Sequence, residues 1–135
     1  MDKKRTSDFN IMLVFILGGL VWFAVRLSYG AFRLPEAKEI LIFLLLAPVA
    51  EELFFRGVVQ DILRRKVASV MLGISLANII TSLCFTLFHI PFWGYMHSAL
   101  VFIPSIIFGF LYDRTGKLAY SVILHSIYNL NIFIV

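Results

Sequence analysis

The sequence predicts an all-α fold, a polytopic membrane helix bundle of about five transmembrane helices, from three observations. Of 135 residues, 61% are hydrophobic and 15% are charged, and the mean hydropathy is +0.93. A soluble chain of this length cannot bury so much apolar side chain, because small domains have a large surface for their volume. The apolar runs are also long enough to cross a bilayer and lack the alternation of a transmembrane barrel. We therefore expect the apolar surface to face lipid.

Each expected helix is an apolar run bounded by charged or turn-forming residues. The first run passes through Trp22 without a small-residue cleavage site, so we expect a retained helix rather than a signal peptide. The third run is expected to stop at Pro91. Strands are not expected, and the whole chain, residues 1–135, is expected to form one domain. The expected helices are residues 9–27, 37–59, 67–90, 98–112 and 118–135, joined by loops at 28–36, 64–66, 91–97 and 113–117.

The basic residues cluster at the ends of these runs and give a net charge of +4. In that position they set topology and contact anionic lipid, so we expect the bilayer and not nucleic acid as the partner. The positive-inside rule places the N-terminus in the cytoplasm and the C-terminus outside. The residues expected on the cytoplasmic side are Lys3, Lys4, Arg5, Arg64, Arg65, Lys66, Arg114 and Lys117.

The second helix carries three charges, Glu51, Glu52 and Arg56. Each charge at bilayer depth costs roughly 2.5–3.5 kcal/mol, so these residues are expected to face a protein interior or a wet cavity. Glu52 and Arg56 are spaced i,i+4 in the favourable order for an ion pair. Glu51 lies about 100° around the helix from Glu52 and is available as a general base or acid. The alternative is a buried ion pair that only ties helices together.

Two histidines and an asparagine lie in the other apolar runs. His89 is near the end of the third, and His125 and Asn129 are spaced i,i+4 in the last, where both can donate to an oxyanion. Each alone is well explained by an interhelical hydrogen bond, but together with the charges they indicate a hydrolytic site.

Two mechanisms fit these residue types. Glu51, His89 and His125 can hold a catalytic zinc that acidifies a water. Without a metal, Glu51 and His89 can deprotonate the water while His125 and Asn129 stabilise the tetrahedral intermediate. The spacing does not separate the two, although the chain has no HExxH pair on one helix.

In a set of straight helices, these residues would lie at different depths in the membrane. At about 1.5 Å per residue, the glutamates are near mid-membrane, whereas the two histidines are at different distances from the helix ends. We therefore expect irregular backbone between Gly57 and Gly73 and kinks at Pro48 and Pro104.

Three short motifs resemble those of the CPBP family, the CAAX-protease and bacteriocin-processing membrane proteins, also called the Abi family. The run Ala47–Gly57 resembles the EExxxR motif, Phe85–His89 the FxxxH motif and His125–Asn129 the HxxxN motif. The run Gly109–Gly116 is similar to the usual approach to the last motif. The resemblance covers about residues 47–130, and its strength lies in the order of all three motifs, each in an apolar helix.

The resemblance implies an intramembrane endopeptidase in the cell membrane of a prokaryote. Its substrate would be a membrane-associated peptide or protein, such as a bacteriocin precursor or a C-terminal sorting segment, more than a prenylated protein. The family has been described both as metalloprotease and as metal-independent glutamic protease. We expect the glutamic type and no cofactor, with zinc as the alternative. The implied roles are Glu51 and His89 for water activation, His125 and Asn129 for the oxyanion, and Glu52 and Arg56 for support.

Other functions were weighed against the peptidase. One is a non-catalytic membrane protein of the same fold that acts in bacteriocin self-immunity or as a scaffold. Another is a small ion-coupled carrier with Glu51 and His125 as a relay, for which the expected paired broken helices are absent. A serine nucleophile at Ser105, Ser121 or Ser126 lacks an acid–base relay and a glycine-flanked elbow.

Overall fold

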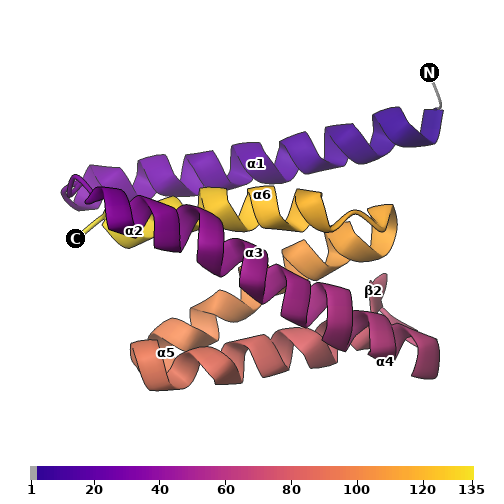
Figure 1. The fold of residues 1–135 in the computed structure, drawn as a ribbon. Coiled ribbons are helices and arrows are strands. Elements are labelled where there is room, and N and C mark those ends of the chain that lie inside the picture. The colour runs from indigo at the N-terminus through magenta and orange to yellow at the C-terminus, as the bar shows by residue number, and fades with distance from the viewer. Residues whose placement is uncertain (1–2) are drawn as a thin grey trace. The chain divides into compact units, whose positions relative to one another are not determined.

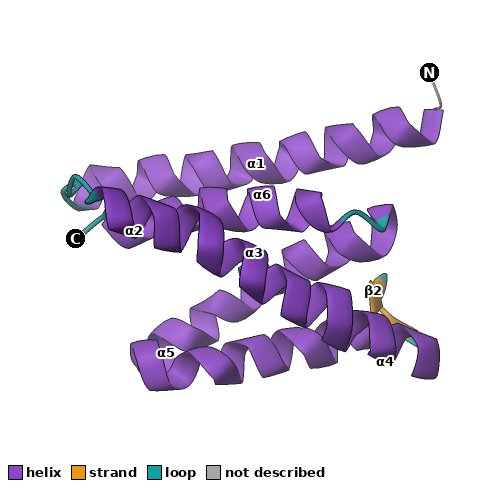
Figure 2. Cartoon of the chain, in the orientation of Figure 1, coloured by secondary structure: helices purple, strands orange, loops and turns teal. Residues whose placement is uncertain are grey.

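The computed structural model describes residues 3–135, and their side chains from residue 7 onward. It is mostly helical, which confirms the all-α class (Figure 1, Figure 2). The elements are α1 Lys3–Tyr29, α2 Ala37–Leu41, π-helical η1 Ile42–Leu46, α3 Ala47–Glu52, π-helical η2 Leu53–Gln60, α4 Asp61–Lys66, β1 Val70–Met71, β2 Ile74–Ser75, α5 Leu76–Thr115, α6 Leu118–Asn129 and η3 Leu130–Phe133, a 3₁₀ helix.

The chain divides into two compact units. The first unit contains the chain up to Ala50 together with Val122–Val135, and the second contains Glu51–Ser121. Each unit is described by itself. The single domain expected over residues 1–135 stays a prediction.

The first unit contains a long apolar helix that pairs with the C-terminal segment. Ser7–Tyr29 of α1 is long and apolar enough to cross a membrane. A side chain at Gly19 would lie 2.6 Å from the Tyr128 ring, so only glycine allows this approach of α1 to α6. Arg26 Nη2 donates to the carbonyl of Ile134 at 3.0 Å. The side chains of residues 3–5, which the orientation prediction uses, lie outside the described side chains.

From Ala37 to Lys66 the chain is helical without a break, but its geometry changes twice to π-helix, in η1 and η2. Single π turns of this kind are rare and recur at functional sites. Here η1 ends immediately before Ala47–Pro48, and η2 begins directly after Glu52. The irregular backbone expected between Gly57 and Gly73 is confirmed by the end of η2 at Gln60 and by the left-handed residues Leu72 and Gly73.

The segment before α5 is a small β-hairpin, in which Val70 pairs with Ser75 and Met71 with Ile74. Two left-handed residues make its turn, Leu72 with φ 51° and Gly73 with φ 81°. Helix α5 then begins where Ser75 Oγ accepts a hydrogen bond from the Asn78 amide at 3.0 Å, a typical N-cap. The expected helix start at residue 67, the short loop at 64–66 and the expected absence of strands were therefore wrong.

Helix α5 consists of two halves that meet at Gly94. This residue has φ 72° and ψ 172°, the one non-helical backbone conformation inside α5, and glycine tolerates it because it has no Cβ. The chain turns back on itself there (Figure 1). The expected helix end at Pro91 was wrong, since the helix includes Pro91, but the expected break between two helices within residues 91–97 is confirmed at Gly94. The kinks expected at Pro48 and Pro104 stay predictions.

Among the described residues, two helices are long and apolar enough to cross a membrane, Ser7–Tyr29 and Leu76–Thr115, and Leu118–Phe133 is a shorter apolar helix. Large apolar side chains along α5, including Leu87, Phe92 and Leu100, are exposed. This exposure agrees with the expectation that the apolar surface faces lipid rather than filling a core.

Candidate active site

Within the second unit, the structure brings Glu51 and His89 together. Glu51 is near the end of α3 and His89 is in the first half of α5, yet Glu51 Oε2 lies 3.7 Å from His89 Nε2. Their side chains are 23% and 13% exposed, respectively, so both are sheltered without being sealed. The pair that sequence analysis singled out for water activation is therefore adjacent in space.

The orientation of the His89 ring is fixed by its own helix. Nδ1 lies 2.8 Å from the carbonyl oxygen of Phe85, one turn earlier. A carbonyl can only accept, so Nδ1 carries the hydrogen, and in the neutral ring Nε2 is left as an acceptor toward Glu51. The rings of Phe85 and His89 also pack with centroids 4.5 Å apart. Nε2 is thus the ring nitrogen left for a partner near Glu51.

The 3.7 Å separation between Glu51 Oε2 and His89 Nε2 exceeds a direct hydrogen bond. Polar atoms at such a distance are commonly bridged by a water. A carboxylate oxygen and an unprotonated ring nitrogen are both acceptors, and a water has a hydrogen for each. The geometry therefore suits a single water that donates to both groups.

The neighbouring carboxylate, Glu52, has a different environment. Arg56 Nε donates to Glu52 Oε2 at 3.2 Å, and both side chains are fully buried. The ion pair predicted from the i,i+4 spacing is therefore confirmed. The predicted separation of the two glutamates around the helix is confirmed as well, because Glu51 faces His89 instead.

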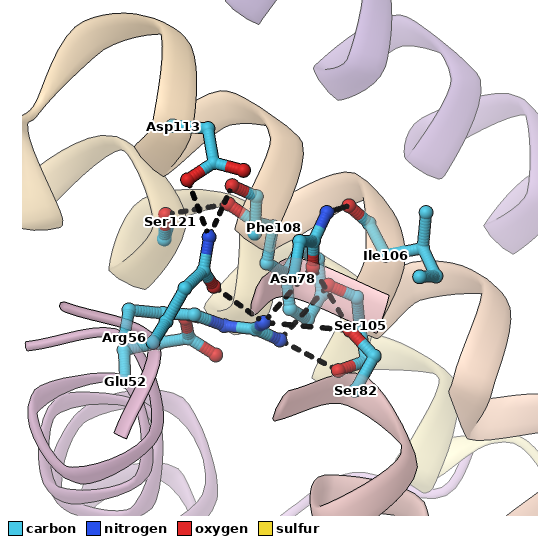
Figure 3. A network of polar contacts seen from close by, with 11 residues as sticks. Glu52, Arg56, Asn78, Ser82, Ser105, Ile106, Phe108, Asp113 and Ser121 are labelled. Atoms are coloured by element: carbon cyan, nitrogen blue, oxygen red, sulfur yellow. Dashed lines mark hydrogen bonds and ion pairs between the residues drawn. The ribbon is translucent and has the colours of Figure 1, made fainter. Parts of the chain in front are cut away.

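The remaining N–H groups of Arg56 also donate to partners inside the second unit (Figure 3). Nη1 donates to Gln60 Oε1 at 3.0 Å, and Nη2 to the carbonyl oxygen and Oγ of Ser105 at 2.8 and 2.6 Å. Longer contacts of 3.4 Å join Nη1 to Asn78 Oδ1 and Ser82 Oγ. Gln60, Asn78, Ser82 and Ser105 are fully buried. We call Glu52, Arg56 and these residues the arginine network.

A further layer of hydrogen bonds holds the partners of Arg56 in turn. Gln60 Nε2 donates to the carbonyl of Gly109 at 3.0 Å and to Asp113 Oδ1 at 2.8 Å. Asn78 Nδ2 donates to the carbonyl of Ile106 at 2.9 Å. Ser75 Oγ also donates to Asp113. Both halves of α5 are thereby connected to η2.

The sequence analysis did not single out Gln60, Asn78, Ser82 or Ser105. A signal was present, since Gln60 continues the i,i+4 series of Glu52 and Arg56, and Asn78 and Ser82 share the same spacing. The structure also explains why residue 109 is a glycine. A Cβ there would lie 1.9 Å from Asn78 Oδ1 and 2.6 Å from Arg56 Nη1, so the network requires glycine.

His125 and Asn129 belong to the first unit, on α6. His125 is 5% exposed. Asn129 Nδ2 donates to the carbonyl of Phe43 at 2.9 Å, in π-helical η1. This bond orients the amide and leaves it a second N–H group for another acceptor. These two residues and the Glu51–His89 pair are in different units, so their joint assignment to one site stays a prediction.

The donor set for a metal was tested on the described residues. Among their side chains, no three His, Cys, Asp or Glu residues cluster closely enough to hold a metal ion. Catalytic zinc normally takes three protein ligands. Because His125 lies in the first unit and Glu51 and His89 lie in the second, a zinc held by these three residues stays an alternative prediction. The expectation that the chain needs no cofactor stays a prediction.

Comparison with protein families gives a match. The model of the family described as type II CAAX prenyl endopeptidase Rce1-like matches residues 33–131. The matched range is most of the chain and includes Glu51, His89, His125 and Asn129. Neither the curated proteins nor the solved structures gave a match.

Proposed function

The chain belongs to the Rce1-like family of type II CAAX prenyl endopeptidases, and from this premise we propose that it is an intramembrane endopeptidase. It hydrolyses a peptide bond of a membrane-associated peptide or protein. The observation that carries the proposal is the 3.7 Å approach of Glu51 Oε2 to His89 Nε2, with Nδ1 of that ring occupied by the Phe85 carbonyl. Two acceptors at this spacing suit one water, which is the nucleophile that peptide hydrolysis needs.

The first step is activation of that water. Glu51 takes one proton, while His89 Nε2 accepts the second O–H and aims the oxygen lone pair at the scissile carbonyl carbon. The oxygen–carbon bond forms as the carbonyl π bond opens, and the negative charge moves to the carbonyl oxygen. Partial shelter of both side chains strengthens these interactions, because bulk water does not screen them fully.

The second step is stabilisation and collapse of the tetrahedral intermediate. In the proposal, His125 and a free N–H of Asn129 donate to the oxyanion. The support for these two residues is their motif, their shared face of α6 and the bond that orients Asn129 on Phe43. The carbon–nitrogen bond then breaks, and the leaving amine takes the proton that Glu51 acquired. The products are a carboxylic acid and an amine, as hydrolysis requires.

The proposal is of the glutamic type, since Glu51, the histidines and Asn129 supply base, orientation and oxyanion donors. We further propose five membrane crossings with the N-terminus in the cytoplasm of a prokaryote. Five helical segments would supply them, namely α1, the helix from Ala37 to Lys66, the two halves of α5 that meet at Gly94, and α6. The basic residues at the segment ends support the orientation.

The test is proteolysis by the purified protein in lipid vesicles. The substrates are membrane-bound peptides with a C-terminal CAAX box, prenylated and unmodified, together with unrelated membrane peptides. We expect wild type to release a product, and Glu51→Gln and His125→Ala to lower the rate at least about a hundredfold, the usual scale for losing a general base or an oxyanion donor.

Asp61→Asn is the matched control, because it removes a partly exposed carboxylate from the same continuous helix. Equal product from wild type, Glu51→Gln and His125→Ala would refute the proposal and favour the non-catalytic role in immunity or scaffolding. A chelator arm separates the mechanisms, because a glutamic peptidase keeps its rate while a zinc enzyme loses it.

A further inference from the structure

We propose that Gln60, Asn78 and Ser105 are positioning residues for the reacting pair. In this proposal they fix the guanidinium of Arg56 and so lock the register of η2 against both halves of α5. That register sets the distance between Glu51 and His89. The inference rests on the proposed function, but its mechanical content concerns only residues of the second unit.

The network and the reacting pair share one helix–helix interface. On α5, Asn78, Ser82, Phe85 and His89 are spaced by four, three and four residues, which places them on a single face. Asn78 and Ser82 contact Arg56, whereas His89 faces Glu51. A slide of one helix along the other would disturb both ends of this face together.

A short chain of contacts leads directly from Arg56 to His89. The Arg56 guanidinium lies 5.8 Å from the centre of the Phe85 ring, within cation–π range. The carbonyl of Phe85 holds His89 Nδ1, and its ring packs on the imidazole. Arg56 therefore contacts the residue that orients His89.

Gln60 follows Arg56 by four residues, so the two side chains lie on the same face of η2. Gln60 accepts from Arg56 Nη1 and donates to Gly109 and Asp113 on the second half of α5.

Burial of the partners of Arg56 is what makes the register of η2 against α5 depend on them. Gln60, Asn78 and Ser105 are fully buried, so water does not replace a partner that is removed. The N–H groups of Arg56 would then bond to other acceptors, which would shift the register of η2 against α5. A misplacement of about 1 Å at a reacting centre lowers turnover by as much as about a hundredfold.

The first test measures kcat and KM for Gln60→Met and Asn78→Leu, which keep the size of the side chain and remove its polar groups. We expect kcat to fall about 10- to 100-fold, with KM changed less than about threefold, because the misalignment affects the reacting atoms. Asn78→Asp keeps an oxygen for Arg56 but loses the N–H group that donates to Ile106, so its kcat is expected to lie between those of Asn78→Leu and wild type. Asp61→Asn is the control and is expected to match wild type.

The second test measures the register without any activity. The protein has a single cysteine, Cys84, so Glu51→Cys and His89→Cys are introduced in a Cys84→Ser background. A short bifunctional thiol reagent then reports how often the two positions approach. We expect Gln60→Met to slow cross-linking at least about fivefold, with no change for Asp61→Asn.

Unchanged cross-linking and unchanged kcat in Gln60→Met would overturn the proposal. A protein without any peptidase activity would refute the proposed function, and cross-linking would still decide the register lock. Ser105→Ala gives a milder change, since it removes Oγ and keeps the carbonyl that Nη2 also contacts. If Asn78→Leu does not fold, Gln60→Met and Ser105→Ala decide the outcome.

Discussion

Glu51 and Glu52 are consecutive carboxylates with opposite environments. Glu52 is fully buried and bonded to Arg56, which has further partners on η2 and both halves of α5. Glu51 is 23% exposed and approaches His89 at a distance suited to a water. One residue of helical rotation thus separates a fully buried carboxylate in an ion pair from a partly exposed carboxylate beside a histidine.

The largest expected effect comes from removing the buried cation. Arg56→Met leaves Glu52 as a buried charge without its ion pair, which typically costs about 3–5 kcal/mol of unfolding free energy. Glu51→Gln is expected to change the unfolding free energy by less than about 1 kcal/mol, because its side chain is partly exposed. Unfolding in detergent micelles, followed by circular dichroism, measures both.

Equal stability of the two variants would contradict the contrast between Glu51 and Glu52. A further variant combines Arg56→Met with Glu52→Leu, which removes both charges. That double variant is expected to be more stable than Arg56→Met alone, because most of the loss in the single variant is the buried charge that stays behind.

The next effect concerns Gly109, whose missing side chain makes room for the network. Gly109→Ala would put a Cβ 1.9 Å from Asn78 Oδ1, and the displaced atoms are themselves hydrogen-bonded. We expect a loss of about 3 kcal/mol, at the upper end for overpacking. Gly18→Ala is the matched control, because a Cβ there meets nothing within 4 Å. Similar unfolding midpoints for the two variants would contradict the tight packing around Arg56.

Much of this site was predictable because its geometry is local. The i,i+4 rule gave the Glu52–Arg56 pair, and helical phase separated Glu51 from it. The partners of Arg56 were not predicted. Gln60 continues the i,i+4 series but was not singled out, and Ser105 meets Arg56 only after α5 folds back. Nothing in the spacing of Ser105, far along the chain, indicates that contact.

In the fold, too, some elements were predicted from the sequence and others were not. Long apolar runs predicted α1 and α6 well, because composition alone decides whether a helix suits lipid. The hairpin before α5 was missed, although Gly73 and Ser75 are ordinary turn and N-cap residues. The break in α5 was assigned to Pro91. In the structure Pro91 is helical, and Gly94 takes the non-helical conformation.

Gly94→Ala isolates the backbone contribution of that break. A Cβ at this position meets nothing within 4 Å, so only the conformation with φ 72° is penalised. We expect a loss of about 1–3 kcal/mol in unfolding free energy. Kcat is expected to stay within about threefold of wild type while the arginine network keeps the two halves of α5 in place. A large loss of kcat with unchanged stability would assign Gly94, rather than the network, the control of the His89 position.

The smallest expected change in unfolding free energy concerns a second ion pair on the same continuous helix, with the same i,i+4 spacing as Glu52 and Arg56. Arg65 Nη2 contacts Asp61 Oδ2 at 2.7 Å, closer than the 3.2 Å of Arg56 and Glu52. The Arg65 side chain is 79% exposed, so solvent screens the pair and supplies other partners. Asp61→Asn is therefore expected to lower the unfolding free energy by less than about 0.5 kcal/mol, and to have no measurable effect on it at high salt. A loss as large as that of Arg56→Met would mean that distance, and not burial with a complete set of acceptors, decides what an ion pair contributes in this chain.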